Sequence, residues 1–163
     1  MTYPKKIVLL GHFGVGKTSL VRQFVETIFS EDYLVTMGVH VKKKEIEIDG
    51  ENIQLIIWDI EGNTSIEKAR SSYLLGAHGF IYVFDIMRPE TYEKIGEEME
   101  YLSINHSKVP CCIVGNKSDL FSNEFTQEFF SDSVFSDAFF TSAKTGDQVN
   151  EVFQAITKKI IAL

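Results

Sequence analysis

Apolar runs and helix-spaced apolar residues alternate along the whole chain, and they predict strands and helices in turn. Short runs rich in β-branched and aromatic residues predict strands over residues 5–10, 39–48, 52–58, 79–85, 109–115 and 138–141. Apolar residues three and four positions apart predict helices over residues 17–28, 89–105, 126–134 and 147–162. This alternation is typical of a mostly parallel sheet with helices on both faces.

Asp49-Gly50 joins the second and third predicted strands, and an Asp-Gly pair in this place is a strong signal for a hairpin turn. The hairpin makes the strand over 39–48 an antiparallel strand at one edge of the sheet. We therefore expect the α/β class: a three-layer sandwich with a six-stranded, mostly parallel sheet, one antiparallel edge strand and about five helices. In such sheets ligands bind beyond the carboxyl ends of the strands, so the residues that follow each strand are the candidates for chemistry.

The composition is that of one ordinary globular domain. A chain of 163 residues has the length of a single domain, and 44% apolar and 24% charged residues lie close to globular averages. Its 16 Lys and Arg against 23 Asp and Glu give a net charge of −7. Nucleic acids and anionic membranes need a dense cationic face, so this charge argues against both as partners.

Nothing in the sequence predicts export or insertion into a membrane. The longest apolar runs fall short of the ~18 residues that span a bilayer, and the first residues form no signal-peptide core. Thr2 excludes N-myristoylation, and the last residues include no cysteine for prenylation. Cys111 and Cys112 are neighbours on a predicted strand, so we expect them on opposite faces as unbridged thiols of a reducing compartment. We expect a cytoplasmic monomer with no membrane anchor in this chain, and peripheral membrane association only if a lipidated tail is missing from it.

The loop after the first strand carries the strongest motif. The segment from Gly11 to Thr18 matches GxxxxGK[ST] between a predicted strand and a predicted helix. Glycines let backbone N–H groups converge on phosphate oxygens, and the helix N-terminus adds partial positive charge. Lys17 would supply a point charge to the terminal phosphates, and the Thr18 hydroxyl would ligate Mg²⁺. The predicted phosphate-binding set is Phe13, Gly14, Val15, Gly16, Lys17, Thr18 and Ser19.

Two further strand ends extend the prediction to a metal and a base. Asp59 ends the third strand, where a carboxylate can hold Mg²⁺ through a water; taken alone, it could also be a helix N-cap. Asn116-Lys117-Ser118-Asp119 follows the fifth strand, and a carboxylate such as Asp119 can accept two hydrogens from the guanine edge, whereas adenine presents the reverse pattern. After the sixth strand, a backbone N–H of the run 141–144 could donate to the guanine oxygen.

These motifs resemble the Ras-like small GTPases over essentially the whole chain, and the Rab branch most. Three segments read as Rab-like: Tyr33 to Val39, the pair Trp58-Asp59, and Ser71 to Gly79. The resemblance implies a single G domain over residues 1–163 with a P-loop fold. It implies a nucleotide-dependent switch that binds GTP or GDP with Mg²⁺ and hydrolyses GTP to GDP and phosphate.

The resemblance also implies roles for individual residues. Phe29 would pack against the guanine, which Asn116, Lys117 and Asp119 would hold with help from Ser142, Ala143 and Lys144. Thr36 would close the first switch on Mg²⁺ and the γ-phosphate, so the metal set is Thr18, Thr36 and Asp59. Gly62 would donate its N–H to the γ-phosphate, and the catalytic set is Lys17, Thr36, Gly62 and Asn63. Effectors, exchange factors and GTPase-activating proteins would bind through Tyr33–Val39 and Asp59–Tyr73.

Three residues depart from the family pattern near the hydrolysis site. Asn63 replaces the water-orienting glutamine with an arm one methylene shorter, and a displacement of about 1 Å can cost roughly 100-fold in rate. Phe13 replaces a small residue where a partner's arginine would enter, and Glu61 places a second carboxylate beside Asp59. We therefore expect slow intrinsic hydrolysis. The alternative is that Phe13 only covers the switch loops and that Glu61 is solvated.

Three functions remain to be compared. The first is a working GTPase switch, and the second is a GTP-loaded interaction module with negligible turnover, which Phe13 and Asn63 favour. The third, an adenine-specific P-loop enzyme such as a small-molecule kinase, is disfavoured by Asp119 and by the lack of an acceptor site.

Overall fold

The computed structural model describes residues 3–30 and 36–163, and within them the chain forms six strands and five α-helices. The strands are β1 Tyr3–Gly11, β2 Val39–Ile48, β3 Glu51–Ile60, β4 Gly79–Asp85, β5 Cys111–Asn116 and β6 Phe139–Thr141. The helices are α1 Lys17–Glu26, α2 Ser71–Leu74, α3 Ile95–Asn105, α4 Asn123–Phe129 and α5 Val149–Ile161. Short 3₁₀ turns cover Ile66–Lys68, Pro89–Thr91, Ser118–Leu120 and Ser133–Phe135.

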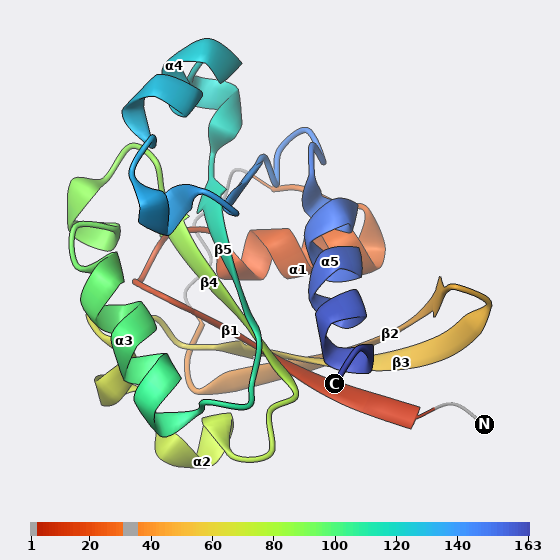
Figure 1. Cartoon of the computed structure of the whole chain (residues 1–163). Helices are drawn as coiled ribbons and strands as arrows, with labels where there is room; N and C mark the ends of the chain where they lie inside the picture. Colours follow the sequence, from red (N-terminus) through yellow and green to blue (C-terminus); the bar gives the residue numbers. More distant parts are fainter. Residues whose placement is uncertain (1–2, 31–35) are drawn as a thin grey trace.

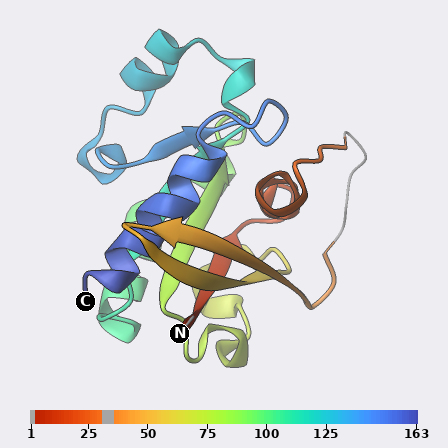
Figure 2. The same cartoon turned by 90° about the vertical axis from the view of Figure 1, so that its right-hand side faces the viewer.

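The strands form one twisted sheet in the order β2-β3-β1-β4-β5-β6 (Figure 1). Only β2 pairs antiparallel, through the hairpin at Asp49-Gly50, and the other pairs among these strands are parallel. The β2–β3 hairpin is long and curled (Figure 2). The expected α/β sandwich with one antiparallel edge strand is therefore confirmed.

Two apolar layers fix the helices to the two faces of the sheet. On β1, Ile7 and Leu9 pack with α1 and α5, whereas Val8 and Leu10 pack with the layer that includes α2 and α3. The two views agree on this arrangement of helices about the sheet (Figures 1 and 2). The adjacent cysteines divide in the same way: Cys112 lies in the α1–α5 layer and Cys111 borders the other, and both are free thiols, as expected. Alternation along a strand thus places neighbouring side chains in opposite layers.

The helix boundaries differ from the predicted ones at two turns. The helix expected over 89–105 begins as the 3₁₀ turn Pro89–Thr91, and α3 starts only at Ile95. The buried Thr91 hydroxyl donates to the carbonyls of Asp85 and Arg88, which ties this turn to the end of β4. In the same way α4 begins at Asn123 instead of residue 126, because the Ser122 hydroxyl caps it by accepting from the Phe125 N–H at 3.2 Å. Such side-chain to backbone bonds leave no trace in the apolar pattern.

The topology brings the ends of distant strands to one rim. The parallel strands β1, β4, β5 and β6 and the neighbouring β3 all end at the same edge of the sheet, where their following loops meet. No helix within the described ranges is long and apolar enough to cross a bilayer.

Two glycines offer a test of this packing. A Cβ on Gly115 would lie 2.7 Å from Phe84 Cζ and 2.8 Å from Phe140 Cδ1, whereas Gly96 in α3 has no atom within 4 Å of its Cβ position. Gly115→Ala should lower the free energy of unfolding by about 1–3 kcal/mol through overpacking. Gly96→Ala should raise it by about 0.5–1 kcal/mol through helix propensity. Urea unfolding of both variants measures the difference, and equal effects of the two would contradict the packing described.

Candidate functional site

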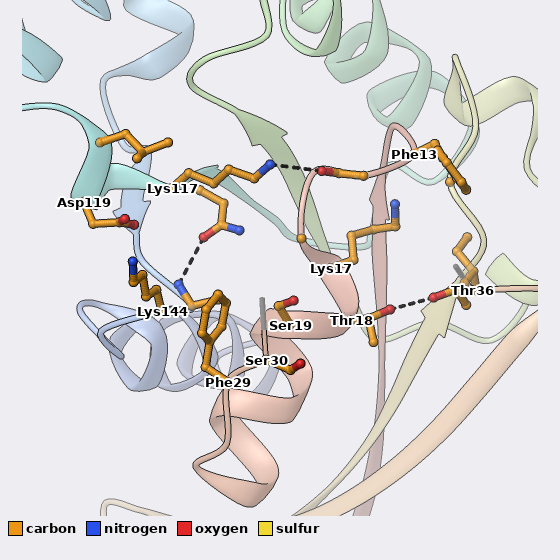
Figure 3. Close-up of a pocket in the computed structure, with 17 residues that line it drawn as sticks. Phe13, Lys17, Thr18, Ser19, Phe29, Ser30, Thr36, Lys117, Asp119 and Lys144 are labelled. Carbon is orange, nitrogen blue, oxygen red and sulfur yellow. Dashed lines mark hydrogen bonds between the residues drawn. The ribbon is translucent and has the colours of Figure 1, made fainter. Parts of the chain in front are cut away.

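A cavity of about 300 Å³ opens at the rim where the strands end (Figure 3). Its walls come from the loops after β1, β3, β5 and β6 and from the start of α1. The lining residues are Phe13, Gly14, Gly16, Lys17, Thr18, Ser19, Phe29, Ser30, Thr36, Ile60, Gly62, Asn116, Lys117, Asp119, Leu120, Ala143 and Lys144. The cavity thus joins nearly all the side chains that the motifs single out.

Lys17 holds a positive charge inside the phosphate loop. Its Nζ donates to the carbonyls of Gly11 at 2.9 Å and His12 at 2.8 Å, and the residue is only 6% exposed. Burial lowers the pKa of Lys17 to about 8, and the charge of Asp59 opposes that shift. Among the described residues this buried ammonium bonds two neutral carbonyls, so it is well placed to attract an anion.

Side chains from the end of β5 hold the backbone of the same loop. Asn116 Nδ2 donates to the Val15 carbonyl at 3.0 Å, and Lys117 Nζ donates to the Gly14 carbonyl at 3.3 Å (Figure 3). Lys117 is itself paired with the buried Asp85 at 2.7 Å. Side chains from outside the loop therefore hold its backbone.

Gly16 has a backbone conformation that favours glycine, and it leaves room for the Asn116 amide. It has a φ of 101°, and a Cβ there would lie 2.3 Å from Asn116 Nδ2. A side chain would therefore both strain the backbone and displace the asparagine.

Asn116 also connects the loop to the other end of the cavity. Its Oδ1 accepts from Thr141 Oγ1 at 3.1 Å and from the Ala143 N–H at 3.3 Å. Nearby, Ser142 Oγ donates to Asp119 Oδ1 at 2.7 Å, which orients that carboxylate. The Asn116 amide and the hydroxyls of Thr141 and Ser142 therefore join the loop after β1 to the ends of β5 and β6.

The far end of the cavity has the form of a slot. Phe29 and Lys144 lie on one side in Figure 3, Lys117 lies on the other, and Asp119 lies at this end. An aromatic ring and the aliphatic stem of a lysine offer two apolar surfaces for a flat ring. The carboxylate supplies an acceptor at its edge.

Thr18, Thr36 and Asp59 form a cluster of oxygen atoms beside the opposite end: Thr18 and Thr36 line the cavity, whereas Asp59 lines a neighbouring hollow that the two threonines share. Thr18 Oγ1 donates to Asp59 Oδ2 at 2.6 Å and lies 2.6 Å from Thr36 Oγ1. Asp59 is 2% exposed, and its Oδ1 has no hydrogen-bond partner among the described residues. Burial raises the pKa of Asp59, and the Thr18 hydrogen bond opposes that rise. An unpartnered buried carboxylate oxygen beside two hydroxyl oxygens fits a hard cation such as Mg²⁺.

Some expected site residues do not face the cavity. Val15 is fully buried and contributes only its backbone, and Ser142 acts through Asp119. The Asn63 side chain donates to the Glu61 carbonyl at 3.0 Å and lines a separate small hollow beneath this segment. Tyr33 and the next two residues of the expected partner segment lie outside the described residues.

Glu61 turns toward the first switch segment. Its Oε2 accepts from the Gly38 N–H at 3.3 Å, and its own N–H donates to the Gly38 carbonyl at 2.8 Å. The Glu61 carboxylate is therefore hydrogen-bonded to the backbone of Gly38.

Phe13 and Gly62 lie in contact at the edge of the cavity. Phe13 is 46% exposed and lines the cavity, and a Cβ on Gly62 would lie 2.3 Å from Phe13 Cα. The segment after β3 thus packs directly on the phosphate loop through a residue without a side chain.

The model of the Ras family matches residues 6–162 of this chain. The chain belongs to the Ras family. It is therefore a small GTPase with a P-loop: a GTP-binding switch protein of a family whose members bind GTP and GDP, typically with Mg²⁺, and interact with regulators and effectors.

The structure of this Ras-family GTPase adds contacts within the site that the motifs did not predict. Asp85 fixes Lys117, and Thr141 fixes Asn116. Both stand at the carboxyl ends of strands, so the rule that directed attention to those ends could have found them. Ser30 and Leu120 also line the cavity, and no sequence pattern marks them.

Thr141 allows a test of the Asn116 network. Thr141→Val removes the hydroxyl that donates to Asn116 Oδ1 and keeps the side-chain volume nearly constant. We expect the affinity of the protein for GDP to fall about tenfold, as for one lost hydrogen bond. Thr157→Val is the matched control, because Thr157 is equally buried but its hydroxyl donates to the Phe153 carbonyl within α5, away from the site. Calorimetry with GDP should separate the two variants, and an equal loss of affinity in both would contradict a specific role of Thr141.

Proposed function

We propose that this chain is a guanine-nucleotide switch of the Rab-like branch that binds GTP or GDP with Mg²⁺ and hydrolyses GTP slowly to GDP and phosphate. The observation that carries the proposal is the pair of hydrogen bonds made by the Asn116 side chain. They join the phosphate loop to the segment beside Asp119. One cavity therefore offers a phosphate site and a purine site to the same molecule.

The proposed contacts divide the nucleotide between the two ends. Backbone N–H groups from Phe13 to Ser19 and the Lys17 ammonium bind the phosphates, and Lys17 meets their charge with its own. Asp119 accepts from the guanine ring N–H and exocyclic amine, while Ala143 and Lys144 border the base opposite Lys117. Phe29 packs on the flat face of the base.

Thr18, Thr36 and Asp59 are the proposed metal-binding residues. When bound, Mg²⁺ would neutralise charge on the terminal phosphates. Thr36 also closes the first switch over the nucleotide, and Gly62 donates its backbone N–H to the γ-phosphate. The hydrogen bonds between Glu61 and Gly38 make the segment of Thr36 and the segment of Gly62 move together.

The proposed hydrolysis step is attack of a water oxygen on the γ-phosphorus, with cleavage of the bond to the β-phosphate oxygen; that oxygen leaves as part of GDP, and the protons of the water pass to the released phosphate and to solvent. Asn63 orients that water, and to do so it must release the Glu61 carbonyl and turn to the cavity. The lost hydrogen bond and the short arm both favour slow turnover. The second candidate, a GTP-loaded interaction module, is favoured by this same orientation of Asn63 and by the exposed Phe13 ring at the cavity edge.

The proposal extends to partners and location. Residues 1–163 form one G domain that acts as a cytoplasmic monomer, and effectors, exchange factors and activating proteins bind at Tyr33–Val39 and Asp59–Tyr73. Glu61 belongs to this surface and links its two parts through Gly38.

Base selection is tested at Asp119. Asp119→Ala should lower the affinity for GTP by about 100-fold or more, because two guanine donors lose their acceptor, and should leave ATP binding unchanged. Calorimetry with both nucleotides measures the preference. The control is Asp137→Ala, which removes an exposed carboxylate outside the cavity lining. An unchanged GTP to ATP ratio in Asp119→Ala would exclude guanine recognition by this residue.

Hydrolysis is tested at Asn63. Asn63→Gln restores the missing methylene and should raise the single-turnover rate of GTP hydrolysis by about 10–100-fold. Asn63→Ala removes the amide and should lower the rate below that of the unchanged protein. Equal rates for all three would show that Asn63 takes no part in hydrolysis and would favour the interaction module; Phe13→Gly in the same assay shows whether the ring limits the rate.

A further inference from the structure

Arg88 reaches the phosphate loop from the turn after β4. Its Nη1 donates to the Phe13 carbonyl at 2.9 Å, across 75 positions of sequence. Its Nε donates to Glu90 Oε1 at 3.1 Å, so the guanidinium is held on a second side. Arg88 itself does not line the cavity. It therefore contacts the loop from outside.

The bond from Arg88 is one of three that hold consecutive carbonyls of the phosphate loop. The Gly14 carbonyl accepts from Lys117 and the Val15 carbonyl accepts from Asn116, so three consecutive loop carbonyls are each held by a side chain from elsewhere in the chain. No peptide bond among the described residues is cis. In a trans peptide the N–H of the following residue points opposite to the carbonyl.

The three N–H groups therefore point away from the three side chains. They belong to Gly14, Val15 and Gly16, and two of these residues line the cavity. A bond to the Phe13 carbonyl thus directs the Gly14 N–H toward the bound phosphates.

We propose that Arg88 is a positioning residue for the phosphate chain: it holds the Phe13–Gly14 peptide so that the Gly14 N–H faces the nucleotide. This inference rests on the proposed function, because it assigns a role toward the phosphates of a nucleotide in this cavity.

The conformational freedom of Gly14 explains why the Phe13–Gly14 peptide needs a hydrogen bond from outside the loop. Its φ is 75°, and glycine adopts positive and negative φ about equally well. The peptide before it can therefore rotate at low cost and exchange its N–H for its carbonyl, which would place an acceptor against the phosphates. Arg88 opposes that rotation by bonding the carbonyl.

The turn that carries Arg88 is itself fixed. The Arg88 N–H donates to the Asp85 carbonyl at 3.0 Å, and the buried Thr91 hydroxyl donates to the Arg88 carbonyl at 2.7 Å. The Asp85 carboxylate in turn holds Lys117. The end of β4 therefore supports Lys117 through Asp85, and the turn after it supplies Arg88, so this short stretch controls two of the three side chains that hold the loop.

Arginine suits this place better than lysine does. Its planar group carries five N–H donors, so it can bond the Phe13 carbonyl and Glu90 at the same time. A lysine ammonium could still reach one of the two acceptors. Arg88→Lys should therefore retain part of the effect.

The test compares nucleotides that differ only in phosphates. Phe13 lies at the opposite end of the cavity from Asp119 and Lys144 (Figure 3), so the β- and γ-phosphates lie nearer to it than the phosphate attached to the ribose. Arg88→Ala should weaken GDP and GTP binding about tenfold, as expected for one misdirected hydrogen bond, and change GMP binding less than twofold. Arg88→Lys should recover part of the loss. Lys108→Ala removes an exposed cation outside the cavity lining and should change none of the three affinities.

Competition binding and calorimetry with GMP, GDP and GTP measure these affinities, with thermal unfolding as a check on the fold. If Arg88→Ala unfolds, Glu90→Ala releases the guanidinium without removing it and should show the same pattern with a smaller loss. Unchanged GDP and GTP affinities, or an equal loss for GMP, would overturn the positioning role. If the unchanged protein binds no guanine nucleotide, the proposed function fails first and takes this inference with it.

Discussion

The amide of Asn116 is the interaction on which the site depends. It is a buried side chain that donates to Val15 in the loop after β1 and accepts from Thr141 at the end of β6 and from Ala143 just after it. A buried amide with unmet bonds is costly, so each of the three segments is stabilised only when the other two are in place. The sheet order makes this arrangement available, because β4 and β5 carry their ends to the side of β1.

The same constraint explains the glycines of the loop. Backbone groups can converge on a phosphate only where side chains are absent, and the Asn116 amide occupies the space that a Cβ on Gly16 would need. The flexibility that glycine brings has a cost, since the loop can adopt competing conformations. Side chains from β5 and from the turn after β4 limit that freedom, so the loop is rigid through its neighbours and not through its own residues.

The sequence predicted the parts of the site that depend on local chemistry. The strand runs, the GxxxxGK[ST] loop and the residues after β5 were enough to place Lys17, Asn116 and Asp119 along one rim. It could not predict contacts between residues far apart in the chain whose types are common, such as Thr141 with Asn116 or Arg88 with Phe13. Nor could it predict that Asn63 bonds the Glu61 carbonyl, because that choice depends on the local backbone and not on residue type.

The segment after β3 links the first switch segment to the phosphate loop through its backbone. Glu61 bonds Gly38 in both directions, Gly62 packs on Phe13, and the Asn63 N–H donates to the Gly11 carbonyl at 3.3 Å. Three consecutive residues thus contact the first switch segment and the first part of the phosphate loop. A displacement of Gly62 must therefore also disturb the Glu61 bonds. Gly62 is tightly packed and has no side chain that could absorb the movement. The backbone of Gly38 would therefore move as well, and not only side chains.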